Sequence, residues 1–415
     1  MGRPLRDTGA RVAVVGAGVS GLTCAQHLRR AGYRRVTVLE RDSRVGGKCC
    51  SIDVGGRSYE LGAVLGTRSY TATFELTGQG EDALMRASAA HCYDLTGRST
   101  PLIPWYRYPD ILRLLLLNYA CLTQGHYRRV GKPGHVGDHP DLYEPFGRFA
   151  ARHGIAPLSS AMAPPFTAFG YGSLQEVPAA YVLKYLDLPT LDALRRPQHS
   201  VVWPDGIERL LTRTAQQYDV RTDSAVCGVQ RGEVVTVETA SDRLTFDALI
   251  LTCPFDEALG FLDATPDEQR LFTAIEHDDY WVLLCDTAGL PDGSGYLPAN
   301  FDRHGHVMLW YRRWPADPLC TLYVLGDFAK TQEQIEATCA ADLERMGARL
   351  HRVVQVRRWK YFPHVGPEAM AAGWYHEVES MQGANRTYYA GEIMSFATVE
   401  LCARYARSLI QRYFA

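Results

Sequence analysis

Three glycines and one carboxylate near the start of the chain have the spacing of a dinucleotide site. Gly16, Gly18 and Gly21 form the pattern G-x-G-x-x-G, and Glu40 follows them. In this pattern the first glycine permits a tight turn, the second lets the backbone approach a pyrophosphate, and the third lets a helix pack closely on a strand. A carboxylate about 20 residues further on accepts a hydrogen bond from a ribose 2′-hydroxyl and would repel a 2′-phosphate. These residues therefore favour a dinucleotide without a 2′-phosphate.

The surrounding sequence predicts the elements that must position these residues. The apolar run 12–15 predicts a buried strand, the apolar positions after Gly21 have helical spacing, and Gly32 is placed to end that helix. A second apolar run, 36–39, ends at Glu40. A glycine-rich turn in an ordinary α/β core is the alternative, but a strand, a helix, a strand and a terminal acid in this order favour nucleotide binding.

A second glycine block narrows the prediction to a flavin. Residues 44–51, Arg-Val-Gly-Gly-Lys-Cys-Cys-Ser, resemble the R-x-G-G-x-x-S/T signature of the flavin amine oxidase and phytoene desaturase superfamily. Alone, Gly46-Gly47 is equally compatible with a plain turn. The resemblance implies an α/β protein with a Rossmann-type, glutathione-reductase-like domain that binds FAD. It implies these cofactor contacts: Gly16, Gly18, Ser20, Gly21, Glu40, Arg41, Gly46, Gly47, Lys48, Gly62, Ala63, Val226, Gly391, Glu392 and Phe396.

The later contacts come from three separate blocks. Gly62-Ala63 follows a predicted hairpin around Gly55-Gly56, and Val226 begins a predicted strand. Residues 388–396 predict a strand, an Ala-Gly-Glu turn and then a helix. In the superfamily the acid of this turn, here Glu392, binds the flavin ribityl chain, and a helix N-terminus suits the partial negative charge of the flavin pyrimidine. The alternative for Glu392 is an ordinary acid at a helix start.

Composition and charge limit the class of protein. The chain has 415 residues, 46% of them apolar and 22% charged, with a formal net charge of −2. This is the composition of a globular protein of two or three domains, with no reason to expect a nucleic-acid partner. The 11 cysteines are scattered without a C-x-x-C pair or zinc-ligand spacing, which favours no metal and a cytoplasmic location. The longest apolar run, 111–117, is too short to span a bilayer, so we expect no stable membrane insertion.

The distribution of strand and helix patterns predicts three domains. We expect a discontinuous FAD-binding domain (1–70, 200–255 and 356–415), a helical cap (71–199) and a substrate-binding sheet domain (256–355). Within the cap, helical spacing covers 109–122 and 174–194, and 124–140 is predicted to be an exposed loop. After the cap, a helix is predicted over 332–350.

A closer resemblance covers about residues 11–414. Residues 166–172 (Phe-Thr-Ala-Phe-Gly-Tyr-Gly), 177–187, 361–365 and 390–396 look like those of bacterial FAD-dependent polyunsaturated fatty acid isomerases, also called linoleate isomerases. The resemblance implies a redox-neutral double-bond isomerase, in which a bis-allylic hydrogen leaves as hydride to flavin N5 and returns to another carbon. Such chemistry needs an apolar aromatic pocket rather than an acid–base pair. The pocket candidates are Phe166, Phe169, Tyr171, Tyr361 and Phe362, although aromatic residues of this kind are as often core packing.

The substrate remains open at this point. A free fatty acid needs a cation for its carboxylate, and Arg86 is the candidate, with Arg68 and Lys184 as others; Lys184 is more readily interpreted as a surface or helix-end charge. Phe169 and Tyr185 are further substrate candidates. Without an anchor, the substrate would be a carrier-bound acyl chain or another polyene. The alternatives are an FAD-dependent amine oxidase or desaturase that passes electrons to oxygen, or a catalytically silent flavin-binding protein. His364 and His376 could move protons in an oxidase, but such histidines are more often structural.

Overall fold

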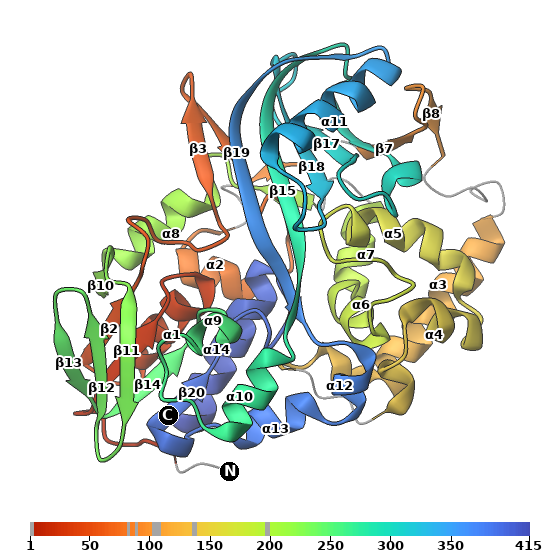
Figure 1. Cartoon of the computed structure of the whole chain (residues 1–415). Coiled ribbons are helices and arrows are strands. Elements are labelled where there is room, and N and C mark those ends of the chain that lie inside the picture. Colours follow the sequence, from red (N-terminus) through yellow and green to blue (C-terminus); the bar gives the residue numbers. More distant parts are fainter. Residues whose placement is uncertain (1–3, 81–83, 88–89, 102–108, 135–138, 196–199) are drawn as a thin grey trace.

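A five-stranded parallel sheet forms the lower part of the molecule in the computed structural model, which describes residues 4–80, 84–87, 90–101, 109–134, 139–195 and 200–415 (Figure 1). Its strands, in spatial order, are β10 (Asp219–Arg221), β2 (Arg35–Leu39), β1 (Arg11–Val15), β14 (Ala248–Leu251) and β20 (Thr387–Tyr389). The central strands are apolar and buried, because helices cover a parallel sheet of this kind. The predicted α/β class is therefore confirmed.

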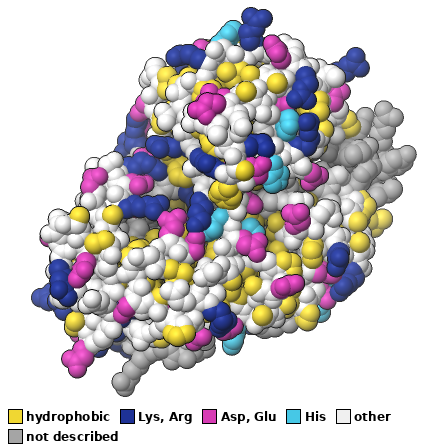
Figure 2. All heavy atoms as spheres, viewed as in Figure 1, with side chains coloured by type: hydrophobic (Ala, Val, Ile, Leu, Met, Phe, Trp, Pro, Cys, Tyr) yellow, Lys and Arg dark blue, Asp and Glu magenta, His cyan; other side chains and the backbone are white. Residues whose placement is uncertain are grey.

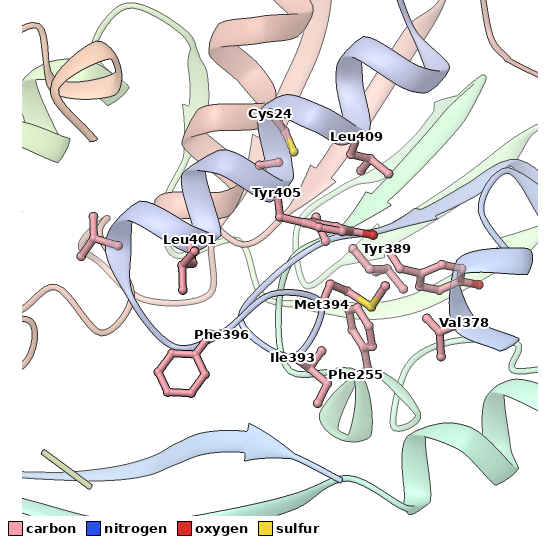
Figure 3. Close-up of a cluster of buried hydrophobic side chains, with 14 of the residues drawn as sticks. Cys24, Phe255, Val378, Tyr389, Ile393, Met394, Phe396, Leu401, Tyr405 and Leu409 are labelled. Carbon is pink, nitrogen blue, oxygen red and sulfur yellow. The ribbon is translucent and has the colours of Figure 1, made fainter. Parts of the chain in front are cut away.

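The helices around this sheet come from the start, the middle and the end of the chain. They are α1 (Val19–Arg30), α2 (Thr71–Thr77), α8 (Ile207–Ala215), α9 (Phe255–Ala258), α10 (Pro266–Thr273), α12 (Pro367–Ala371), α13 (Trp374–Ser380) and α14 (Val399–Tyr413). α1 packs along α14, so the first and last helices lie side by side. Figure 3 shows the resulting core, in which Leu401, Tyr405 and Leu409 of α14 face the residues after β20. The ring of Phe396 points away from α14.

Two antiparallel units extend from this layer. The first is the three-stranded sheet β11 (Val226–Arg231), β12 (Val235–Thr239) and β13 (Arg243–Phe246). The second is the hairpin β3 (Ser51–Val54) and β4 (Arg57–Glu60), in which Val54 pairs with Arg57. The hairpin predicted around Gly55-Gly56 is confirmed, and both glycines have positive φ.

A seven-stranded mixed sheet forms the upper part. Its order is β19 (Arg349–His364), β15 (Glu276–Ala288), β18 (Leu319–Leu325), β17 (Val307–Arg312), β16 (Gly293–Tyr296), β7 (Ala90–Tyr93) and β8 (Ser99–Thr100). Successive residues of a strand face opposite sides. Tyr280 and Val282 of β15 therefore join one hydrophobic cluster, whereas Trp281 and Leu283 join another, which also holds residues of α11 (Gln332–Arg345). Figure 1 shows β15 and β19 continuing from this sheet toward α10 and α12.

The helices of residues 109–195 form a third layer at the right of Figure 1. They are α3 (Pro109–Cys121), the π-helix η2 (Leu122–His126), the 3₁₀-helix η3 (Arg128–Gly131), α4 (Phe146–Arg152), α5 (Ser159–Thr167), α6 (Ala179–Tyr185) and α7 (Leu188–Arg195). A small sheet of β5 (Gly66–Thr67), β9 (Ser200–Val202) and β6 (Met85–Arg86) joins this layer to the rest. No helix among the described residues is long and apolar enough to cross a membrane.

Several predicted helices have different bounds. The helix predicted over 332–350 ends at Arg345, because strand β19 begins at Arg349. The helical pattern over 174–194 forms two helices with a break at 186–187. Part of the loop predicted over 124–140 is the end of η2 and then η3, while 135–138 lie outside the described residues. The last helix begins at Val399 behind its Thr398 cap, so Glu392 lies in the turn before it rather than at a helix start.

Candidate active site

The first glycine turn has no room for a side chain. Gly16 has φ of +104°, a conformation that favours glycine. A Cβ on Gly21 would lie 1.9 Å from the carbonyl oxygen of Gly16, so α1 can begin this close to β1 only with glycine at that position. The N-terminus of α1 therefore sits directly above the strand end, which is the arrangement that binds a pyrophosphate.

The second glycine block faces the first. Gly18 and Gly46 form an isolated parallel bridge, and a Cβ on Gly47 would lie 3.3 Å from the Cα of Gly18. Arg44 braces this turn from behind, because its guanidinium donates to the carbonyl oxygens of Gly47 at 2.5 Å and Cys49 at 3.1 Å. The two turns together form a cradle of bare backbone, which we call the glycine cradle (16–21 and 44–49).

The carboxylate of Glu40 is held at the edge of the glycine cradle. Only 8% of the residue is exposed. Its two oxygens accept hydrogen bonds from the backbone N–H groups of Ala17 at 2.7 Å and Asp42 at 3.0 Å. A carboxylate has about four acceptor positions, so Glu40 keeps capacity for a sugar hydroxyl. The glycine cradle and this acid fit the phosphates and ribose of a dinucleotide.

Lys48 connects the glycine cradle to the C-terminal part of the site. Its ammonium forms an ion pair with Glu392 and lies 5.5 Å above the centre of the Tyr361 ring. Gly62 lies against the same turn, since a Cβ there would meet the carbonyl oxygen of Lys48 at 1.7 Å. Gly391 has φ of +120° beside Thr252, at the end of β14. Three chain segments that are remote in sequence, around residues 48, 361 and 392, therefore meet at Lys48.

One cavity of about 730 Å³ extends over the whole site. Among its lining residues are these predicted cofactor contacts: Gly16, Gly18, Ser20, Glu40, Arg41, Gly46, Gly47, Lys48, Gly62, Ala63, Val226 and Glu392. Gly21, Gly391 and Phe396 are not among them; Gly21 lies beneath the turn and Phe396 belongs to the core. The roles of all these residues stay predictions.

Aromatic residues line the cavity beyond Lys48. They are Tyr70, Phe169, Tyr171, Tyr185, Tyr280, Tyr323, Trp359 and Tyr361. The rings of Tyr171 and Tyr361 stack with centroids 5.6 Å apart, and Tyr280 stacks on Tyr361 at 5.0 Å. The Tyr171 hydroxyl donates to the carbonyl oxygen of Ala397 at 3.1 Å, and the Tyr361 hydroxyl donates to that of Tyr171 at 3.3 Å. We call the tyrosines and Phe169 of this set the aromatic wall.

The tyrosines of the aromatic wall are held in their neutral form. Burial raises the pKa of Tyr171, Tyr280 and Tyr361 far above the ordinary range of a tyrosine. The hydroxyl of Tyr323 is buried without a hydrogen-bond partner among the described residues, whereas that of Tyr280 donates to the carbonyl oxygen of Ala168 at 2.8 Å. These groups offer ring faces and neutral hydroxyls, not a base.

Two of the predicted pocket residues lie behind the aromatic wall. Phe166 and Phe362 are fully buried and do not line the cavity. Their rings contact that of Tyr171 from behind, at 5.5 and 5.4 Å between centroids. Phe362 has φ of +43°, an uncommon conformation for a bulky residue. This kink near the end of β19 accompanies the bulge opposite 276–278, and bulges re-aim side chains. Tyr361 and Phe362 are consecutive, yet the first belongs to the aromatic wall and the second packs behind it.

The predicted cations do not reach the aromatic wall. Arg86 and Arg68 are exposed and neither lines the cavity. The prediction of a surface charge at Lys184 is wrong. The residue lies in the last turn of α6, but it is only 3% exposed. Its ammonium donates to the carbonyl oxygens of Val130, Lys132 and Gly134 at 2.5 to 3.0 Å. Residues 130–134 cover this end of α6. Sequence spacing gives no sign of that contact, because the two segments are about 50 residues apart.

The two histidines also lie away from the cavity lining. The Nδ1 atom of His364 is 2.8 Å from the carbonyl oxygen of Phe362, and burial lowers the pKa of this histidine. His376 is exposed on α13. His277, which the sequence did not single out, does line the cavity, where its Nε2 atom is 3.1 Å from Asp256.

Sequence reasoning also missed Tyr280, Val282 and Tyr323, which the seven-stranded sheet contributes to the cavity. Strand alternation within the apolar run 280–285 was the available signal, because it separates Tyr280 and Val282 from Trp281 and Leu283. It could not say which set faces the cavity, since both faces of this sheet are buried.

Comparison with known proteins identifies the family. Residues 19–407 match the family described as flavin containing amine oxidoreductase. The chain belongs to this family. It is similar to a CLA-producing fatty acid isomerase from P. acnes, with a TM-score of 0.92, 34% identity, and coverage of 99% of this chain and 100% of that one. The resemblance to fatty acid isomerases predicted from the sequence is thus confirmed.

Two fungal proteins are also similar over most of this flavoenzyme. The FAD-dependent oxidoreductase dpasF of Apiospora sacchari is 26% identical over 92% of this chain and 87% of its own length. The beta-cyclopiazonate dehydrogenase of Aspergillus oryzae is 24% identical over 93% of this chain and 89% of its own length. The glycine cradle and the carboxylate of Glu40 therefore belong to an enzyme with a flavin cofactor.

Proposed function

We propose that this chain is an FAD-dependent, redox-neutral double-bond isomerase of a polyunsaturated fatty acid or a related acyl chain. The observation that carries the proposal is the continuity of one cavity from the glycine cradle to an aromatic wall of neutral residues. Similarity along the whole chain to a fatty acid isomerase supports the same conclusion.

The residues around the cavity suit FAD in particular. The glycine cradle would hold the diphosphate, Glu40 the adenosine ribose, and Glu392 the ribityl chain. Val226 and Arg41 line the cavity near Glu40, where the adenine would lie. Bound FAD supplies an acceptor that can take a hydride from carbon and give it back.

The aromatic wall would bind and orient the unsaturated chain. Phe169, Tyr171, Tyr185 and Tyr361 present flat apolar surfaces that limit the conformations of a flexible chain, which lowers the entropic cost of reaction. Their ring faces attract positive charge, so they would stabilise the cationic character that develops when a hydride leaves. Because the wall is buried, it also excludes the water that would trap such a cation.

Each lysine and arginine that lines the cavity is paired with a carboxylate. Lys48 pairs with Glu392, Arg41 with Glu257, Lys360 with Asp256, and Arg358 with Asp279. Within the described part of the chain, no lysine or arginine that lines the cavity is therefore left without a carboxylate partner to bind the head group of a fatty acid. This supports a substrate bound mainly through its apolar chain, whether as a free acid or on a carrier.

An FAD-dependent oxidase or desaturase is the second candidate. The specific observation in its favour is that both fungal relatives are named as an oxidoreductase or a dehydrogenase. Such an enzyme would use the same cavity but would pass electrons to an acceptor after each turnover.

An anaerobic assay separates the two candidates. The yellow protein is mixed with linoleic acid without oxygen while the flavin band and the conjugated-diene absorbance are followed. Diene formed over many turnovers with the flavin oxidised at the end supports the isomerase. A flavin bleached once without diene, and H₂O₂ formed when air is admitted, would establish an oxidase instead. No change in either band would exclude linoleic acid as substrate, and linoleoyl thioesters are then tested in the same way.

A further inference from the structure

Helix α3 exposes an apolar face to solvent. Within the described residues the large exposed hydrophobic side chains are Leu114, Leu117, Val234 and Phe328, and the two leucines are the most exposed, at 66% and 60%. They lie three positions apart, so they share one helix face, and the exposed Cys121 continues that face one turn later. Single apolar residues on a surface are ordinary, but adjacent ones on one helix face mark an interaction site.

The segment that contains α3 is strongly basic. Between Asp110 and Asp138 the sequence has no acidic residue, and it has Arg113, Arg128, Arg129 and Lys132, in a chain whose net charge is −2. Arg113, Arg128 and Lys132 are exposed. Figure 2 shows hydrophobic and basic side chains close together at the right-hand edge of the molecule, in the region of α3 and α4 in Figure 1.

Buried contacts fix the backbone of the basic turn 128–132 and of the two residues that follow it. The ammonium of Lys184 binds the carbonyl oxygens of Val130, Lys132 and Gly134, and the guanidinium of Arg404 donates to that of Gly131 at 2.9 Å. The turn therefore has a fixed backbone from which its basic side chains extend.

The acidic residues that follow this segment do not neutralise it. Asp141 and Glu144 both accept hydrogen bonds from Arg152, at 3.0 Å each. This one guanidinium offsets one of the two carboxylates, so the three residues together leave a net charge of about −1 against the four Lys and Arg residues of the segment.

The inner side of α3 packs against the corner between α6 and α7. The buried hydroxyl of Tyr119 donates to the carbonyl oxygen of Leu186 at 2.7 Å, at the corner between α6 and α7. From this corner, Tyr185, Thr190 and Ala193 line the cavity. Helix α3 therefore packs on its inner side against the segment that lines the cavity, and it presents an apolar, basic surface on its outer side.

We infer that the outer face of α3 and the basic turn 128–132 dock this protein on the surface of an anionic lipid bilayer. Leucines on one face of a short helix enter the boundary between head groups and acyl chains, and nearby Lys and Arg side chains are attracted to anionic lipids. The helix is too short to span, so the contact is peripheral. The inference goes beyond the proposed function, because docking places the cavity wall next to a store of apolar chains but does not require turnover.

Vesicle flotation with the full-length flavoprotein tests this inference without any substrate. We expect the protein to float with vesicles of phosphatidylcholine and phosphatidylglycerol, to bind pure phosphatidylcholine weakly, and to lose binding as salt rises. Protein that stays at the bottom with both kinds of vesicle at low salt would overturn the inference.

Matched variants locate the docking surface. We expect Leu114→Gln/Leu117→Gln and Arg128→Gln/Lys132→Gln each to weaken vesicle partitioning on the order of tenfold or more. Val234→Gln/Phe328→Gln and Arg34→Gln/Arg35→Gln change exposed residues elsewhere and should bind as the parent does. Circular dichroism and the flavin spectrum check that every variant is folded. Equal binding by all four variants would refute the location. Light scattering without vesicles gives a further check: a dimer that the leucine variant abolishes would assign the face to a second copy of this chain and overturn the lipid assignment.

Discussion

The ammonium of Lys48 is paired with the carboxylate of Glu392, 344 positions further along the chain. Both side chains are about three-quarters buried, with 22% and 26% exposed. The pair lies where the glycine cradle meets the aromatic wall, and the ring of Tyr361 lies under the ammonium. It therefore joins the glycine cradle to the segment around Glu392 and to the aromatic wall.

We expect Lys48→Met and Glu392→Gln each to lower stability and flavin retention, because each change leaves its former partner partly buried and unpaired. Each should cost about 1–3 kcal/mol. The double variant should lose less than the sum of the two, with a coupling energy of about 0.5–3 kcal/mol. Thermal unfolding and the ratio of flavin to protein absorbance measure both effects. Strictly additive losses would show that the pair makes no contribution as a unit.

Two buried tyrosines on neighbouring strands should respond differently to loss of the hydroxyl. Tyr280→Phe removes a hydrogen bond to Ala168 and should destabilise by about 0.5–1.5 kcal/mol. Tyr323→Phe removes a hydroxyl that has no partner in the described chain, so it should leave stability unchanged or raise it slightly. Chemical denaturation of the two variants side by side tests this. A large loss of stability in Tyr323→Phe would reveal an ordered water on that hydroxyl, and a raised KM alone would reveal a substrate group there.

The pH dependence of stability should contain a contribution from Asp256. Burial acts to raise the pKa of this carboxyl, but hydrogen bonds from His277 and Lys360 outweigh it and lower the pKa to about 2. A carboxyl whose pKa is lower in the folded state adds stability above its unfolded pKa, and this stability is lost as the pH falls through the folded value. We expect Asp256→Asn to cost about 1–2 kcal/mol at neutral pH, after solvent screening.

Unfolding curves measured between about pH 4 and pH 2 check this assignment. The parent should lose stability across this window more steeply than Asp256→Asn does. Asp267→Asn is the control, because the side chain of Asp267 is 73% exposed. Parallel slopes for the parent and Asp256→Asn would contradict the assignment.

Lys184 should stabilise the cap through the basic turn. Lys184→Met keeps the length of the side chain but leaves three carbonyl oxygens without their donor, which should cost about 1–3 kcal/mol. Lys132→Met, on the exposed side of the same turn, should change stability by no more than about 0.5 kcal/mol. Proteolysis of the cap and thermal unfolding measure the difference. Equal stability of the two variants would show that the carbonyl oxygens are satisfied by water.

The sequence predicted the parts of the site that local backbone rules determine. Gly16 and Gly21 occupy positions that only glycine can fill, and the acid at Glu40 follows from strand length, so this unit could be predicted directly from the G-x-G-x-x-G spacing. The second glycine block and the segment around Glu392 were predicted by resemblance to a family, because nothing in their spacing says that they meet.

The aromatic wall was predicted only in part, for a physical reason. Phe169, Tyr171 and Tyr361 line the cavity, but Phe166 and Phe362 lie behind it, and Tyr280 and Tyr323 were missed. A sheet that is buried on both faces gives no polar alternation to mark its cavity side. The positive φ of Phe362, which accompanies the change in side-chain direction, depends on packing against distant helices rather than on its neighbours in sequence.

Neighbouring strands of the parallel sheet are synthesised at very different times, because their spatial order differs from their order in the sequence. β1 and β2 are synthesised first, whereas β20, which completes the sheet beside β14, follows about 350 residues later. At about 5–20 residues per second, the nascent glycine cradle waits roughly 20 to 70 s for Glu392 and α14. From the synthesis of β14 until β20 follows 136 residues later, roughly 7 to 27 s, one edge of β14 has no partner strand. The edge of β14 is therefore open to pairing with other strands until β20 is made, and the cavity is complete only after Glu392 and α14 have been synthesised.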